Sequence, residues 1–172
     1  MEKKPVSPWL KGLVISLITI AASIALQYAG KTDDKGIGMI PVVLLLAGII
    51  WACISYSKQM DAQVTFGNVF YHGFQVAACV TIFMIIYTIF SVKILFPEQY
   101  EAGMAKARAQ MEKDNKLTKA EIDDLMDKSK KFFVPLIMIG VIFLYGILGT
   151  IFALIGGLVA KKNPNPTPFN QS

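Results

Sequence analysis

The stretch that decides the fold is FFVPLIMIGVIFLYGILGTIFALIGGLVA, residues 132–160, which contains no Asp, Glu, Lys or Arg. A bilayer core about 30 Å thick is crossed by a helix of about 20 apolar residues, so this stretch is long enough to span it. Three further stretches without these charged side chains precede it, at 12–30, 36–57 and 62–92. Because backbone groups in lipid must be hydrogen bonded within their own segment, each stretch is expected to be a helix. The sequence therefore predicts an all-α polytopic membrane protein with four transmembrane helices.

The composition agrees with this fold class. Of the 172 residues, 54% are hydrophobic and 17% are charged, whereas about 25% of a soluble domain is charged. We expect one membrane domain over 1–172, with spans at about 9–28, 37–56, 72–92 and 132–160. Residues 65–71 mix aromatic and small polar types and are expected to lie at the interface before the third span. A secretory signal is the alternative for the first span, but residues 25–30 lack a cleavage pattern, so we expect a retained helix.

An extramembrane helical hairpin is predicted between the third and fourth spans, at 97–131. Residues 93–131 carry nine basic and eight acidic side chains. The first helix has one apolar face, formed by Tyr100, Met104, Ala107 and Met111. Thr118–Glu121 is a capping box that starts a second helix, and this helix can continue into the fourth span. One face of the second helix also forms an apolar stripe, which contains Ile122, Leu125, Met126 and Ser129. The two stripes either pack on each other or the headgroups, or form a docking face. The Pro-rich tail, 161–172, is predicted to be disordered.

The charge pattern bears on sidedness and on partners. Four spans place both termini on one side of the membrane. The positive-inside rule gives two conflicting answers for that side. The 93–131 segment holds more Lys and Arg than the side with the termini, which would place this segment in the cytoplasm. The first helix favours cytoplasmic termini, since three lysines precede it and two follow it. The net charge of +5 suits anionic lipid headgroups and gives no reason to expect nucleic acid.

Few polar groups in the spans are candidates for chemistry. His72 and Gln75 are the candidate polar intramembrane site, as a proton or ligand contact inside the bundle. The alternative is an interfacial His72 that is hydrogen bonded to a neighbouring carbonyl or to headgroups. Lys11 is expected to lie at one end of the first span. Cys53 and Cys79 are expected to be small buried hydrophobes, with an interhelical disulfide as the alternative. With one histidine in the chain, they cannot complete a tetrahedral metal site.

Small residues recur at every fourth position in three of the four spans. Such spacing lets helix backbones approach closely in lipid. The candidate packing residues are either contacts within the four-helix bundle or a face for a homo-oligomer: Ala21, Ala25 and Ala29; Gly73 and Ala77, continued by Thr81; and Gly149, Ala153 and Gly157. Serine and threonine hydroxyls in the spans are expected to link helices by hydrogen bonds.

No catalytic set is found. The sequence has no Gly-x-Ser-x-Gly, no His-Glu-x-x-His and no phosphate-binding glycine-rich loop with lysine. We therefore expect no catalytic residues, no metal, no cofactor and no enzymatic activity.

The order of features resembles a known family over nearly the whole chain. The residues that carry the resemblance are Val64-Thr65-Phe66-Gly67 with Phe70 and Gly73, then Phe96-Pro97-x-x-Tyr100, and a final Gly-rich span that ends in Lys161-Lys162. This pattern is similar to the bacterial membrane proteins catalogued as domain of unknown function 4199. The resemblance implies four spans in a bacterial inner membrane and implies no mechanism.

These observations favour a non-enzymatic accessory or scaffolding protein of the bacterial inner membrane. Its expected partners are the lipid bilayer and either a second copy in a homo-oligomer or a membrane-protein partner. The alternative is a small oligomeric transporter or permeation unit that uses His72 and Gln75.

Overall fold

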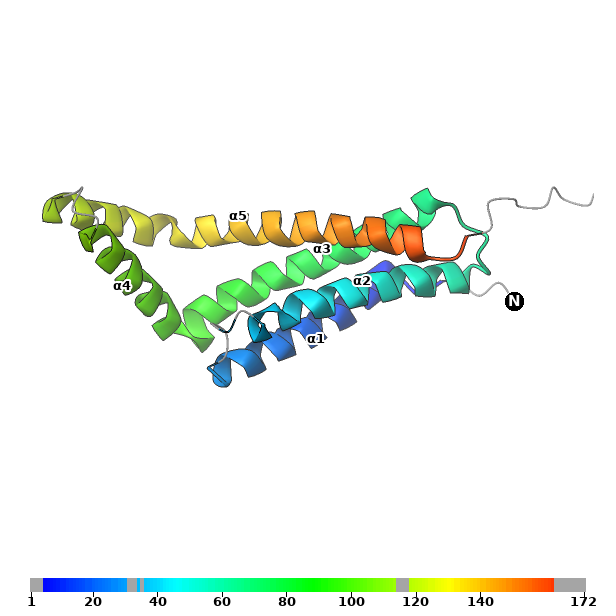
Figure 1. Ribbon diagram of the computed structural model, residues 1–172, viewed down its shortest axis with the longest axis horizontal. Helices are drawn as coiled ribbons and strands as arrows, with labels where there is room; N and C mark the ends of the chain where they lie inside the picture. Colours follow the sequence, from blue (N-terminus) through cyan, green and yellow to red (C-terminus); the bar gives the residue numbers. More distant parts are fainter. Residues whose placement is uncertain (1–4, 31–33, 35, 114–117, 163–172) are drawn as a thin grey trace, which may run out of the picture. The chain divides into compact units, whose positions relative to one another are not determined.

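The computed structural model describes residues 5–30, 34, 36–113 and 118–162, and every regular element in these residues is helical (Figure 1). The α-helices are α1 Pro8–Tyr28, α2 Ile40–Gln59, α3 Phe66–Phe90, α4 Pro97–Lys113 and α5 Lys119–Val159. A 3-10 turn, η1 Ile37–Met39, leads into α2, and a π-helical turn, η2 Ser91–Leu95, follows α3. Four helical segments are long and apolar enough to cross a membrane: Pro8–Tyr28, Ile37–Gln59, Phe66–Leu95 and Lys119–Val159. The predicted all-helical, multi-pass architecture is confirmed.

Two helices begin earlier than the spans assigned from the sequence. Helix α3 starts at Phe66, so the expected interfacial lead-in is already helical. The Thr65 side chain explains this start, because its Oγ1 accepts a hydrogen bond from the Asn68 backbone N–H at 3.3 Å. Helix α5 runs unbroken from Lys119 to Val159 with Pro135 inside it, so the second hairpin helix and the fourth span are one helix. The Pro-rich tail beyond residue 162 lies outside the described residues.

The chain divides into two compact units, of which the first comprises residues 1–84 and 143–172. It contains α1, α2, most of α3 and the C-terminal part of α5. Helices α1 and α2 lie side by side and antiparallel (Figure 1). One end of this unit is tied by hydrogen bonds: the Val6 N–H donates to Gln59 Oε1 at 2.9 Å, and the Ser57 hydroxyl donates to the Lys161 carbonyl. The chain segments at 6, 57–59 and 161 therefore meet at one end of the bundle.

Helix α1 turns its polar side inward. Its buried residues are Lys11, Gly12, Ile15, Ser16 and Thr19, whereas the large apolar side chains of Leu10, Val14, Leu17 and Ile18 are exposed. The Ser16 and Thr19 hydroxyls do not link helices as expected. Ser16 donates to the Leu13 carbonyl, and Thr19 donates to the Ile15 carbonyl, both at 2.8 Å. A carbonyl three or four residues earlier is the nearest acceptor for a short hydroxyl side chain on a helix, which explains the difference.

The second unit, residues 85–142, contains the hairpin. Its two arms are α4 and the N-terminal part of α5. The rings of Tyr100 and Phe133 meet edge to face with centroids 4.4 Å apart, and Ile122 and Met126 are buried. The two arms therefore contact each other, but the predicted stripes are only partly enclosed, since Leu125 is 38% exposed.

Candidate functional site

The most unusual group in the first unit is Lys11, which lies in the first turn of α1 and is only 3% exposed. Its Nζ donates to the Ala52 carbonyl of α2 at 3.4 Å and lies 3.3 Å from Nε2 of His72 on α3. A lysine ammonium is strongly hydrated in water, so its burial in an apolar bundle requires partners that replace that water. The carbonyl and the imidazole are these partners.

His72 completes a site that joins three helices. It is 5% exposed, and its ring stacks on Tyr56 of α2 with centroids 4.2 Å apart and planes 12° from parallel. Ala52 and Tyr56 are one helical turn apart, so α2 presents its carbonyl and its ring on the same face. We call Lys11, Ala52, Tyr56 and His72 the polar cluster.

The two residues of the predicted polar site lie in different surroundings. His72 is buried in the bundle, while Gln75 is half-buried and the hydrogen-bonding side chain at His72 is Lys11. Sequence reasoning placed Lys11 at one end of the first span and did not count it among the intramembrane polar groups. The signal that could have found it is the polar face of α1, since Lys11, Ser16 and Thr19 share one side of the helix.

Glycines bring the helices of the first unit into close contact. A Cβ at Gly73 would lie 2.5 Å from Cys53 Sγ, and one at Gly149 would lie 2.7 Å from Ala77 Cβ. Gly73 also faces Ala153, and Gly157 faces the ring of Phe66 and the Cβ of Phe70. The small-residue stripes of α3 and α5 therefore pack on each other within one chain.

The stripe of α1 has a different environment. Ala21, Ala25 and Ala29 are all exposed in the chain. They take no part in the α3–α5 contact, and their role in an oligomer stays a prediction.

Both cysteines are buried free thiols. Cys53 lies between Gly73 and Gly156, and its thiol donates to the Val69 carbonyl at 3.8 Å. Cys79 lies against Gly12, and its thiol donates to the Trp9 carbonyl at 3.5 Å. Each thiol fills the space left by a glycine on a neighbouring helix.

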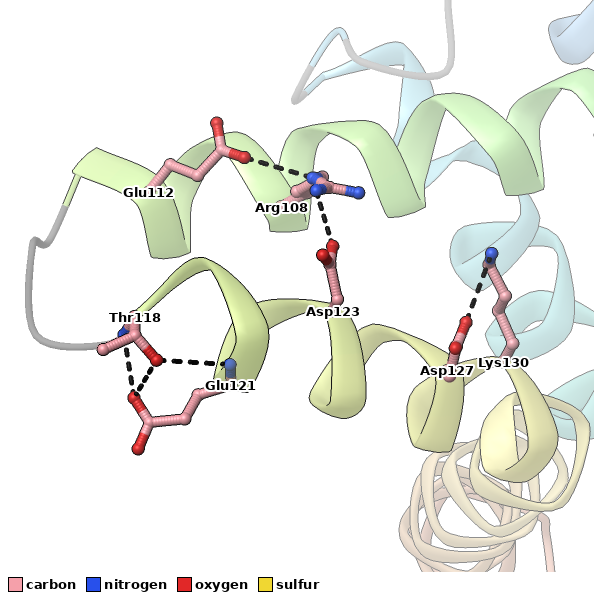
Figure 2. A network of polar contacts seen from close by, with 7 residues as sticks. All are labelled: Arg108, Glu112, Thr118, Glu121, Asp123, Asp127 and Lys130. Carbon is pink, nitrogen blue, oxygen red and sulfur yellow. Dashed lines mark hydrogen bonds and ion pairs between the residues drawn. The ribbon is translucent and has the colours of Figure 1, made fainter.

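Charged side chains join the two arms of the hairpin (Figure 2). Arg108 of α4 donates to Glu112 at 3.1 Å and, across the hairpin, to Asp123 of α5 at 2.6 Å. Hydrogen bonding to Glu112, together with the charge of Asp123, raises the pKa of the Arg108 guanidinium above its ordinary value. The Arg108–Asp123 pair therefore links α4 to α5 within the hairpin.

The predicted capping box is present at the start of α5 (Figure 2). The Thr118 N–H donates to Glu121 Oε2 at 2.8 Å, and the Glu121 N–H donates to Thr118 Oγ1 at 3.4 Å. This reciprocal pair satisfies two backbone donors that a helix start leaves free, so α5 begins beside this box.

In the described part of the chain, no three His, Cys, Asp or Glu side chains gather so that they could hold a metal ion. Comparisons with curated proteins and with solved structures give no match. The family model described as "Protein of unknown function (DUF4199)" matches residues 10–162, which include the polar cluster, the glycine contacts and the hairpin. The chain belongs to the DUF4199 family.

Proposed function

We propose that this protein is a non-enzymatic accessory or scaffolding component of the bacterial inner membrane. Its first unit acts as the membrane anchor, and its hairpin is the surface that binds another membrane protein. The bacterial inner membrane is supported by the resemblance to the family's motifs.

The observation that carries the proposal is the hairpin. Ile122 and Met126 of its second arm are buried, at 2% and 6% exposure. Its charged residues are directed outward, and the side chains of Arg108 and Asp123 stay about half exposed even though they pair. A folded, charged helical surface on a membrane anchor suits recognition by charge complementarity, which sets specificity and association rate.

Close packing of the first unit supports an anchor role. Helices approach closely at several glycines, where a Cβ added to the glycine would lie less than 3 Å from a side chain of the neighbouring helix. These glycines are Gly12, Gly48, Gly73, Gly149 and Gly156. Such contacts rigidify a bundle in lipid.

A small oligomeric transporter is the second candidate. The polar cluster favours it, because ionisable groups buried in membrane bundles commonly mark ion or proton pathways.

Affinity purification of the tagged full-length chain from native membranes in mild detergent tests the proposal. We expect a second protein in fixed stoichiometry. A variant with two exposed hairpin charges reversed, Glu101→Lys with Lys106→Glu, is expected to lose this protein. The matched control, Lys58→Glu, reverses an exposed charge at the end of α2 and is expected to retain it.

Two outcomes contradict the proposal. Recovery of the chain alone, as a defined homo-oligomer, would favour the transporter. Equal recovery of a partner by the hairpin variant and by wild type would show that the hairpin is not the binding surface.

A further inference from the structure

The polar cluster brings two bases into contact within a membrane-spanning bundle. Lys11 and His72 are nearly fully buried, and Nζ and Nε2 lie 3.3 Å apart. The two residues come from α1 and α3 and are separated by 61 positions in the chain. Neither residue belongs to the hairpin, so the cluster is independent of the proposed binding surface.

The contact limits the charge that the pair can hold. An ammonium offers three N–H donors and no acceptor, and an imidazolium offers two N–H donors and no acceptor. With both groups protonated, N–H would face N–H, and two positive charges would repel each other in a site of low dielectric. The observed contact therefore fits a pair with at most one positive charge.

The surroundings of the pair do not change this limit. From α2, the Ala52 carbonyl accepts from Lys11, the Tyr56 ring stacks on His72, and the Cys53 thiol is directed to the Val69 carbonyl. Where α5 packs nearby, Gly156 faces Cys53 and Ala153 faces Gly73, and neither is ionisable. The partners that Lys11 contacts are a carbonyl and a ring nitrogen rather than a carboxylate.

We propose that Lys11 and His72 form a proton-binding site that holds a single positive charge between Nζ and Nε2 and joins α1 to α3. In this state the ammonium donates to Nε2, and the ring carries its proton on Nδ1. A second proton forces two cations together, so acid weakens the attachment of α1 to the rest of the bundle.

The single histidine of the chain makes a direct test available. The full-length protein, labelled with 15N-histidine and held in lipid nanodiscs, shows the ring nitrogens of His72 alone. At neutral pH we expect one neutral tautomer, with the proton on Nδ1 and Nε2 as a hydrogen-bond acceptor. In Lys11→Met the ring is expected to exchange between both tautomers. An imidazolium in the wild-type spectrum at neutral pH, or tautomer exchange equal to that of the variant, overturns the proposal.

Thermal unfolding at neutral and at mildly acidic pH tests the coupling to α1. We expect the Tm of wild type to be lower at acidic pH than at neutral pH. In Lys11→Met and in His72→Gln, this difference in Tm is expected to be no more than half of the wild-type difference. The control Lys58→Met removes an exposed ammonium at the end of α2 and is expected to keep the whole difference. Retention of the whole difference by both cluster variants contradicts the proposal. If a variant does not fold, the wild-type tautomer spectrum still decides.

Discussion

At the scale of single residues, the turn between α2 and α3 contains backbone strain. Asp61 and Ala62 have φ values of 51° and 60°, in the left-handed region where Cβ crowds the following carbonyl. Hydrogen bonds hold this turn, since the Asp61 N–H donates to the Lys58 carbonyl at 3.2 Å and the Ala62 N–H to the Ser57 carbonyl at 2.9 Å. Aspartate tolerates this conformation better than alanine does, so the strain is concentrated at Ala62.

Ala62→Gly is expected to stabilise the protein. Glycine adopts positive φ without a steric cost, and after its greater entropy loss on folding is subtracted, the net gain is about 0.5–1 kcal/mol in the free energy of unfolding. Ala62→Val should act in the opposite direction, because a β-branched side chain is worse in this region. Denaturant-induced unfolding in detergent micelles measures both. A less stable glycine variant would contradict the strained turn.

At the scale of helices, one face of α5 carries the contact with α3. Gly149 faces Ala77, whereas a Cβ at Gly146, nearly one turn earlier on the same helix, would meet nothing within 4 Å. A substitution at Gly149 therefore disturbs the fold of the single chain. A change of oligomeric state caused by a large side chain at Gly149 would reflect this internal packing rather than a subunit interface.

The two glycines form a matched pair for a test. Gly149→Ala adds a Cβ 2.7 Å from Ala77 Cβ and is expected to destabilise the bundle by about 1–3 kcal/mol, as overpacking does. Gly146→Ala adds a Cβ to open space, and the better helix propensity of alanine should stabilise by about 0.5–1 kcal/mol. Unfolding of both variants by the same denaturant gives the two signs. Equal effects of the two substitutions would rule out the glycine contact.

At the scale of the whole molecule, the number of crossings determines membrane topology. Four crossings return the chain to the side from which it started, and the hydrogen bonds from Val6 to Gln59 and from Ser57 to Lys161 agree with this for the first unit. By the same count, the segment between the third and fourth spans emerges on the other side. Because the first helix follows a lysine-bearing start, we predict that the termini are cytoplasmic.

Single added cysteines test this topology in intact vesicles. The native thiols of Cys53 and Cys79 are 0% and 1% exposed, so they give little background labelling. We expect a membrane-impermeant maleimide to label Lys58→Cys and Lys161→Cys from the cytoplasmic side and Lys106→Cys from the opposite side. Labelling of the residue 58 and residue 106 variants from the same side would contradict four crossings.

The sequence by itself determined the four apolar spans, the helical hairpin and the capping box. Each of these depends on residues that are close in the chain. A span is recognised when the length of an apolar run matches the thickness of the bilayer, and Thr118 caps its helix together with a residue three positions away. The start of α3 was less accessible, because an interfacial segment continues a helix without a change in local pattern. The spans and the capping box can be predicted because their energies depend on local composition and backbone hydrogen bonds.

Only the tertiary structure decided which face of each helix turns inward. It brings Lys11 beside His72, packs the stripe of α3 against that of α5, and leaves Ala21, Ala25 and Ala29 exposed. The physical reason is that lipid tails are as apolar as the side chains of these helices, so hydrophobicity does not distinguish a packed face from a lipid-facing one. The choice depends on close fit, such as a thiol against a glycine, and on a buried ammonium that must find an acceptor. Both requirements are met only by residues far apart in the chain.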